Sequence, residues 1–119
     1  MACKKLLIVE DDEAIRQMMQ DVLEIEGYEI LSASDGQQGL EMLRAHAETP
    51  CLIILDMMMP KVNGWQFLDE QRANPKYAGI PVIVCSAYRE SAKTVKPHAF
   101  VEKPVQLPVL TKAVKAFCA

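Results

Sequence analysis

The sequence has no hydrophobic run near the length of about 20 residues that a membrane-crossing helix needs. Its first apolar stretch, Leu6–Val9, is short and meets three acidic residues at once, so it does not resemble the core of a signal peptide. Positive charge is not in excess either, because 13 Lys and Arg residues stand against 16 Asp and Glu. A nucleic-acid surface would need clustered Lys and Arg. These absences predict a cytoplasmic protein that binds neither membranes nor nucleic acid.

Metal-binding and redox cysteine motifs are also missing. The four cysteines, Cys3, Cys51, Cys85 and Cys118, form no C-x-x-C pair, which argues against the usual zinc and redox arrangements. They lie in or beside apolar segments, so we expect reduced, mostly buried thiols, as in a cytosolic protein. A chain of 119 residues, half of them apolar, has room for one buried core and no second domain. We therefore expect a single domain over residues 1–119.

Short apolar runs alternate with helical patterns along the chain. The predicted strands are Lys5–Val9, Tyr28–Ala33, Cys51–Leu55, Ile80–Cys85 and Pro97–Val101. Apolar residues spaced three and four apart predict helices between them. These helices are Glu13–Glu26, ended by Gly27; a segment capped by Ser34 or Asp35; a segment from Asn63 or Gly64 to Asn74-Pro75; and a last helix carrying Leu107, Leu110, Val114 and Phe117.

Strands that alternate with helices predict a parallel sheet covered by helices on both faces. Five such units in a chain of this length fit an α/β, flavodoxin-like doubly wound sheet with the strand order 2-1-3-4-5. In this architecture, functional groups gather just beyond the carboxyl ends of the strands. The residues at those ends are therefore the candidates for a functional site.

Polar side chains stand at four of the predicted strand ends: Glu10 and Asp11 after the first, Asp56 after the third, Ser86 after the fourth and Lys103 after the fifth. Three carboxylates held close together repel one another, and a hard cation such as Mg²⁺ would bind them in their ionised form. Mg²⁺ and the Lys103 ammonium together would balance the three carboxylates. Such a pocket suits an incoming phosphoryl group, with Asp56 as the nucleophile that forms an aspartyl phosphate.

Each of these residues also has a plainer interpretation. The acids after the first strand are suited to capping a helix, and Asp56 and Ser86 are common turn residues. Lys103 alone would be a solvated surface lysine. Met57–Met59 are better explained by packing than by a metal site. The functional interpretation is favoured because it accounts for all four strand ends at once.

In their order and spacing, these motifs resemble the receiver domain of two-component response regulators over nearly the whole chain. Glu10-Asp11-Asp12 is similar to the acidic pair that follows the first strand of that family. The segment from Asp56 to Asn63-Gly64, with Met59-Pro60 between them, resembles its phosphoacceptor segment. Val84–Ala87 resembles the segment with a conformational hydroxyl, and Val101–Pro104 the lysine-proline signature.

The resemblance implies a Mg²⁺ site and a phosphoryl acceptor. Glu10, Asp11 and Asp56 would hold the ion together with the backbone carbonyl of Met58, whereas Asp12 would only cap a helix. The phosphoryl group would come from a phosphohistidine on a histidine kinase or a histidine phosphotransfer protein. The protein would then be a signalling switch that assists its own phosphotransfer and dephosphorylation, and not an enzyme acting on other molecules.

The resemblance also implies how the switch would work. Ser86 and Lys103 would each bond a phosphoryl oxygen, and Ser86 would move towards the phosphoryl group. Phe100, at the position of the family's switching aromatic, would turn inward into the space that is vacated. The Lys103-Pro104 peptide would be cis.

The segment between Ser86 and Lys103 is shorter than family members usually have. Ala92 and Val95 are its only apolar pair at helical spacing, and Pro97 blocks a longer helix. We therefore expect the fourth helix to be one or two turns at most, or an irregular loop. Because that face is the family's usual dimer surface, we expect a monomer or a weak dimer.

The alternative function is a non-phosphorylated protein-interaction domain of the same fold, a pseudo-receiver. An idle pocket of that kind would not need all five polar residues at the strand ends. An aspartyl-nucleophile phosphatase would need a second acid where Met58 stands, and a flavin carrier would need hydroxyls and amides where residues 10–12 are acidic. Both a stand-alone regulator and a receiver within a longer protein, such as a hybrid kinase, fit the sequence.

Overall fold

The computed structural model describes residues 4–45, 49–57, 59, 62–87 and 96–117. The strands are β1 (Lys5–Val9), β2 (Glu29–Ala33), β3 (Leu52–Asp56), β4 (Val82–Ser86) and β5 (Ala99–Glu102). The helices are α1 (Glu13–Ile25), α2 (Gly36–Ala45), α3 (Gly64–Ala73) and α5 (Leu107–Phe117). The strands form one parallel sheet in the order β2-β1-β3-β4-β5, which confirms the predicted doubly wound sheet.

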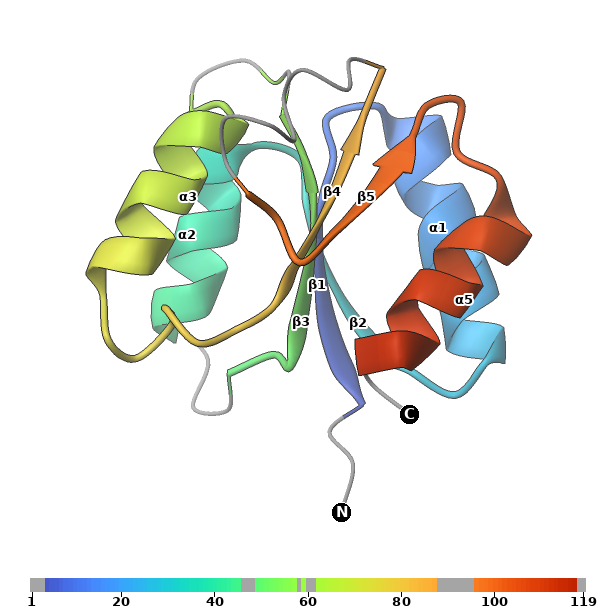
Figure 1. Ribbon diagram of the computed structural model, residues 1–119, viewed down its shortest axis with the longest axis horizontal. Coiled ribbons are helices and arrows are strands. Elements are labelled where there is room, and N and C mark those ends of the chain that lie inside the picture. Colours follow the sequence, from blue (N-terminus) through green and yellow to red (C-terminus); the bar gives the residue numbers. More distant parts are fainter. Residues whose placement is uncertain (1–3, 46–48, 58, 60–61, 88–95, 118–119) are drawn as a thin grey trace.

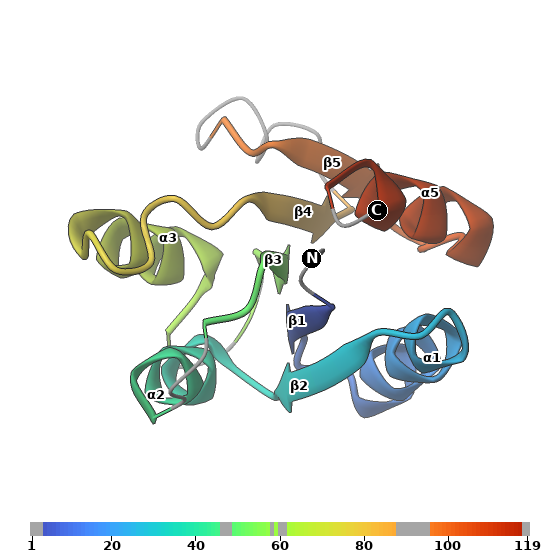
Figure 2. The same cartoon turned by 90° about the horizontal axis from the view of Figure 1, so that it is seen from below.

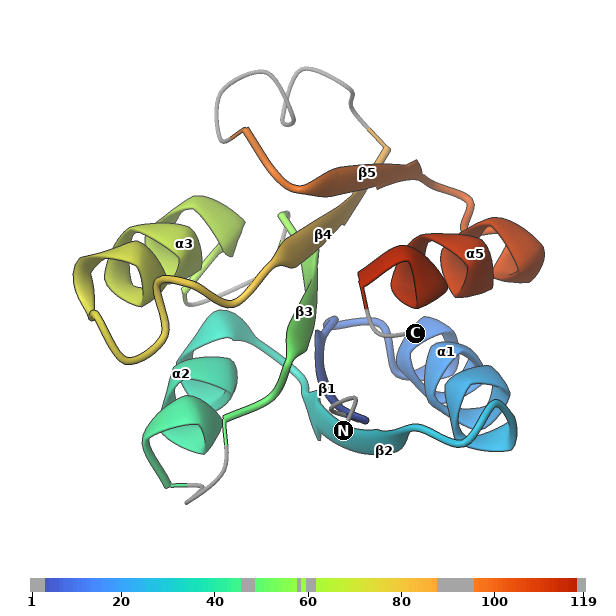
Figure 3. The same cartoon turned by 60° about the horizontal axis from the view of Figure 1, so that its bottom comes forward.

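The helices lie in two pairs on opposite faces of the sheet. Figure 1 shows α2 and α3 on one side and α1 and α5 on the other, and the turned views in Figures 2 and 3 show the sheet between the two pairs. Two apolar layers fill the space between sheet and helices. The α2/α3-side core contains Leu7, Val9, Leu55, Phe67 and Val84 among its members; the α1/α5-side core contains Ile8, Leu23, Ile54, Leu110 and Val114 among its members.

Every residue of β3 and β4 is buried, as expected of central strands covered on both faces. Each fully buried Leu, Ile or Val side chain contributes about 1.5–3 kcal/mol relative to exposure. The carboxyl ends of these strands are therefore held on a rigid support. Within the described residues, no helix is long and apolar enough to cross a membrane.

Polar side chains set where the helices begin. Asp12 is the N-cap of α1 and accepts a hydrogen bond from the Ile15 backbone N–H at 3.0 Å, which confirms its predicted capping role. Asp35, and not Ser34, caps α2, because its Oδ1 accepts the Gln38 N–H at 2.8 Å.

The predicted ends of α1 and α3 are also close to those in the structure. The helix α1 ends at Ile25, and Gly27 follows with φ +96°, a left-handed conformation that favours glycine. A capping box joins Asn63 and Gln66 at the start of α3, with both hydrogen bonds at 2.9–3.0 Å. The α3 helix ends at Ala73, with Asn74 as its C-cap.

Strands β3, β4 and β5 lie one or two residues later than predicted. Pro81 and Pro97 lack the N–H that a ladder needs, so β4 and β5 begin after them. At the other end, Asp56 pairs with Cys85 and Ser86 pairs with Glu102. The apolar pattern located the apolar part of each strand, whereas backbone pairing continues through Asp56 and Ser86, whose polar side chains are also buried.

Several predictions concern residues outside the described parts of the chain. The expected short or irregular fourth helix falls mostly on residues 88–95, and the Met58 carbonyl, Cys3 and Cys118 also lie outside them. Of the described cysteines, Cys85 is buried and Cys51 is half-buried, and both are free thiols.

Candidate functional site

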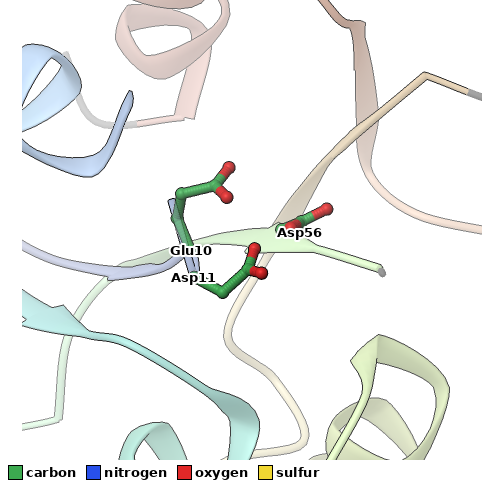
Figure 4. A group of neighbouring side chains, drawn as sticks. All are labelled: Glu10, Asp11 and Asp56. Atoms are coloured by element: carbon green, nitrogen blue, oxygen red, sulfur yellow. The ribbon is translucent and has the colours of Figure 1, made fainter. Parts of the chain in front are cut away.

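Three carboxylates meet beyond the carboxyl ends of β1 and β3. Glu10 and Asp11 directly follow β1, and Asp56 is the last residue of β3 (Figure 4). One oxygen from each lies within 4.8 Å of the others. Glu10 and Asp56 are buried, with 1% and 3% of their surface exposed, and Asp11 is exposed. The structure thus brings together the three acids predicted to act as metal ligands.

Glu10 is fixed by hydrogen bonds from three different segments. Its N–H donates to the Ala33 carbonyl at the end of β2, at 3.0 Å. Its carbonyl accepts from Arg16 Nη1 at 2.8 Å, and its Oε2 accepts from the Asp12 N–H at 3.1 Å. The turn that carries the acids is therefore tied to both β2 and the first turn of α1.

Asp56 is positioned by its strand and by a close approach of α3. The Gly64 N–H donates to the carbonyl of Met57, the residue after Asp56, at 3.0 Å. A Cβ on Gly64 would lie 2.6 Å from the Met57 Cα, closer than real Cβ atoms come to backbone. The sequence Asn63-Gly64 therefore combines a helix cap with the one residue type that fits against the Asp56 loop.

Lys103 reaches the same acids from the end of β5. Its Nζ lies 2.9 Å from Glu10 Oε1 and 3.5 Å from Asp56 Oδ1. The backbone N–H of Lys103 donates to the Ser86 carbonyl at 2.9 Å. The Lys103-Pro104 peptide is cis, as expected. Burial disfavours the ammonium, but the hydrogen bond and charge of Glu10, with Asp56, outweigh it and raise the pKa of Lys103 above its usual value.

Ser86 and Phe100 occupy neighbouring strands at this edge. Ser86 is buried and ends β4, so it lies at the same end of the sheet as the acids. Phe100 is half-buried in β5, pairs with Val84 of β4, and packs against the α2/α3-side core. The aromatic ring is thus next to the strand that carries the hydroxyl.

The acids and the lysine line a hollow of about 250 Å³, with Asp12, Ile15 and Ala87 completing its wall. Two features of the site were not predicted from the sequence. Asp12 was predicted only as a cap, and the Arg16 contact with the Glu10 carbonyl was not predicted. The only sequence signal for the Arg16 contact was its position in the predicted helix, four residues after the cap Asp12.

The donor set fits a hard divalent cation. All three acids offer carboxylate oxygens, and Mg²⁺ prefers oxygen ligands while keeping several waters. Asp11 is exposed, whereas Glu10 and Asp56 are buried, so an ion bound here would have solvent on one side. Of the described residues that line this hollow, Lys103 is the one that carries a positive charge.

The Cys85 thiol lies buried beside the site. Cys85 is the residue paired with Asp56 in the sheet. Burial, followed by the charge of Glu10, raises the pKa of Cys85 to about 12, and Asp56 adds to the effect against Lys103. The raised pKa disfavours the thiolate that nucleophilic chemistry needs, and the side chain packs in the α1/α5-side core.

Residues 6–115 match the family model of the response regulator receiver domain. The chain is 28% identical over 119 residues to the polar-differentiation response regulator DivK of Brucella anthropi, covering 96% of this chain and 95% of that protein. It is 38% identical over 87 residues to the probable transcriptional regulator ycf27 of Porphyra purpurea, covering 73% of this chain and 34% of that protein. The chain thus spans about a third of the length of that relative.

The solved structure of the chemotaxis response regulator CheY4 of Vibrio cholerae has the same fold. It superposes with a TM-score of 0.87 at 27% sequence identity, covering 97% of this chain and 98% of that one. The likeness therefore extends over the whole sheet and its helices.

Proposed function

The chain belongs to the response regulator receiver family of two-component signal transduction, and we propose that it accepts a phosphoryl group on Asp56 in a Mg²⁺-dependent reaction. The donor is a phosphohistidine on a histidine kinase or a histidine phosphotransfer protein. One observation carries the proposal: the Lys103 ammonium lies between Glu10 and Asp56, in a hollow that Asp11 also lines. Phosphoryl transfer depends mainly on such positioning and charge neutralisation.

In the proposed transfer, a carboxylate oxygen of Asp56 attacks the phosphorus of the phosphohistidine. The new P–O bond forms as the P–N bond breaks, and the imidazole keeps the electron pair and takes up a proton. Lys103, 3.5 Å from Asp56 Oδ1, would bond one phosphoryl oxygen. The nearby acids raise its pKa above the usual value for lysine, which favours the charged ammonium.

Glu10, Asp11 and Asp56 are proposed to hold Mg²⁺, with the Met58 carbonyl as a further ligand. The bound ion would neutralise carboxylate charge and stabilise the charge that develops on the phosphoryl oxygens. Glu10 is suited to a fixed role, since its backbone and one carboxylate oxygen are held by three hydrogen bonds. Asp11, the exposed member of the set, would face the solvent side of the ion.

Ser86 and Phe100 are proposed to convert the modification into a change of shape. A phosphoryl group adds about −1.5 to −2 of charge and new acceptor oxygens. The Ser86 hydroxyl would bond one of these oxygens, and Phe100 would turn inward. The modification thereby shifts the population between two packed states, because it makes contacts in only one of them, and so alters the affinity for protein partners. The free thiols of Cys51 and Cys85 suit the reducing cytoplasm as the site of action.

Intact-mass spectrometry after incubation with a small phosphodonor and Mg²⁺ tests this function. We expect the mass of one phosphoryl group to be added to the wild type and to Asp69→Asn, a control on the exposed face of α3. We expect no addition to Asp56→Asn, or to the wild type in the presence of EDTA. A wild type that is never modified, yet binds a partner equally with and without Mg²⁺ and donor, would instead be a pseudo-receiver.

A further inference from the structure

Asp12 places a fixed negative charge at the opening of the hollow. Its Oδ1 accepts the Ile15 N–H at 3.0 Å, and its own N–H donates to Glu10 Oε2 at 3.1 Å. The residue is exposed, yet it lines the same hollow as Asp56 and Lys103. Asp12 therefore lies where a phosphodonor that entered the hollow towards Asp56 would pass.

Among the described residues, the charges that line the hollow remain negative even when a divalent cation is bound. Within that set, four carboxylates against one ammonium leave three negative charges, and a divalent cation reduces these to one. That remaining charge is the contribution of Asp12, because the other groups then balance. Two charges near the hollow have opposite sign and offset each other. They are the positive charge of Arg16, which donates to the Glu10 carbonyl, and the negative charge of the exposed Glu13, which follows Asp12 at the start of α1.

We infer that Asp12 is a specificity-determining residue that disfavours small, doubly negative phosphodonors relative to a phosphohistidine carried on a protein. This inference rests on the proposed function of Asp56. A free acyl phosphate meets the Asp12 charge with nothing to compensate it, so its local concentration at the opening falls. A protein donor brings Lys or Arg side chains of its own, which pair with the acids at the opening.

Phosphorylation kinetics with two small donors tests the inference, each variant being measured at its own saturating Mg²⁺ concentration. Asp12→Asn removes the charge and keeps a side chain that caps helices equally well. At low ionic strength we expect it to react about threefold faster than the wild type with acetyl phosphate, a dianion. The gain should be smaller with phosphoramidate, a monoanion, and should shrink in high salt.

Two further variants separate this effect from other causes. Asp12→Ser, a second neutral cap, should behave as Asp12→Asn does if the charge is responsible. Glu13→Gln makes the same charge change one residue later, away from the hollow, and should leave the ratio of the two donor rates unchanged. Thermal melting verifies that each variant is folded.

The inference is overturned if Asp12→Asn gains nothing with acetyl phosphate, if the gain is equal for both donors, or if Glu13→Gln reproduces it. If the wild type takes a phosphoryl group from neither donor, the proposed function itself fails and the inference falls with it. A wild type that is modified at Asp56 while the variants do not differ from it refutes the role of Asp12 alone.

Discussion

Replacing Asp11 by Asn should reverse the order of stability between variant and wild type when Mg²⁺ is added. The Asp11 carboxylate lies within 4.8 Å of those of Glu10 and Asp56. At that separation, each like-charge pair costs about 1 kcal/mol in a water-like dielectric. Removing one member relieves two such repulsions but also loses attraction to Lys103. We therefore expect Asp11→Asn to raise the free energy of unfolding by about 1 kcal/mol in EDTA.

With Mg²⁺ present the comparison changes sign, because the ion binds the folded wild type and stabilises it. A concentration ten times the dissociation constant adds about 1.4 kcal/mol to the wild type. Asp11→Asn lacks a ligand and gains much less, so it becomes the less stable of the two. Urea unfolding with and without Mg²⁺ measures both differences, and Asp69→Asn on α3 is the control that should show neither.

Two results would refute the reasoning. A variant that is less stable than the wild type in EDTA would show that the acids do not repel one another in the folded chain. A wild type whose unfolding midpoint does not respond to Mg²⁺ would show that the three carboxylates do not form a cation site.

Four other tests concern the surroundings of the site. Cys85, with its pKa raised to about 12, should resist iodoacetamide at pH 8 until the protein unfolds, whereas the half-buried Cys51 should react sooner; peptide mapping of alkylated samples distinguishes them. In the unfolded chain the Cys85 thiol ionises near its ordinary pKa of 9.0, whereas the folded protein keeps it protonated to higher pH. The free energy of unfolding therefore keeps the full contribution of this group below pH 9 and loses up to about 1.4 kcal/mol per pH unit above it. Urea unfolding at a series of pH values should show a smaller loss in Cys85→Ala. Gly64→Ala should cost about 2–3 kcal/mol, because its Cβ would overlap the Asp56 loop, whereas Gly79→Ala, with nothing within 4 Å of the added Cβ, should change the unfolding midpoint little. Arg16→Met removes the hydrogen bond to the Glu10 carbonyl and should lower the free energy of unfolding by about 1 kcal/mol. It should also weaken Mg²⁺ binding in a titration; an unchanged affinity would mean that this hydrogen bond is not needed to position Glu10.

The sequence predicted the sheet order because alternating apolar runs and helical stripes admit few right-handed arrangements. It also predicted which residues meet at one edge, since the topology of a parallel sheet gathers all carboxyl ends there. The individual roles of Glu10, Asp11, Asp56, Ser86 and Lys103 in ion binding and transfer stay predictions. Their side chains, however, come from segments that only the fold brings together.

Features that depend on side-chain direction were harder to predict. The observed ends of β3 and β4 lie later than the predicted ends, because backbone hydrogen bonding continues through Asp56 and Ser86 although their side chains are polar. The contact of Arg16 with the Glu10 carbonyl depends on how the chain turns between β1 and α1, and residue spacing alone does not determine that turn. The same holds for Asp12, whose capping role was evident, whereas its place at the rim of the hollow follows from the three-dimensional turn.

The ion pair between Lys103 and the acids joins parts of the chain that are far apart in sequence. The proposed site is incomplete until β1, β3, β4 and β5 have all paired, and such long-range parallel pairings are among the slower steps of folding. A nascent or partly unfolded chain thus exposes Asp56 as an ordinary aspartate, with no ammonium beside it. If Asp56 is the phosphoryl acceptor as proposed, only completely folded molecules would be able to receive the signal.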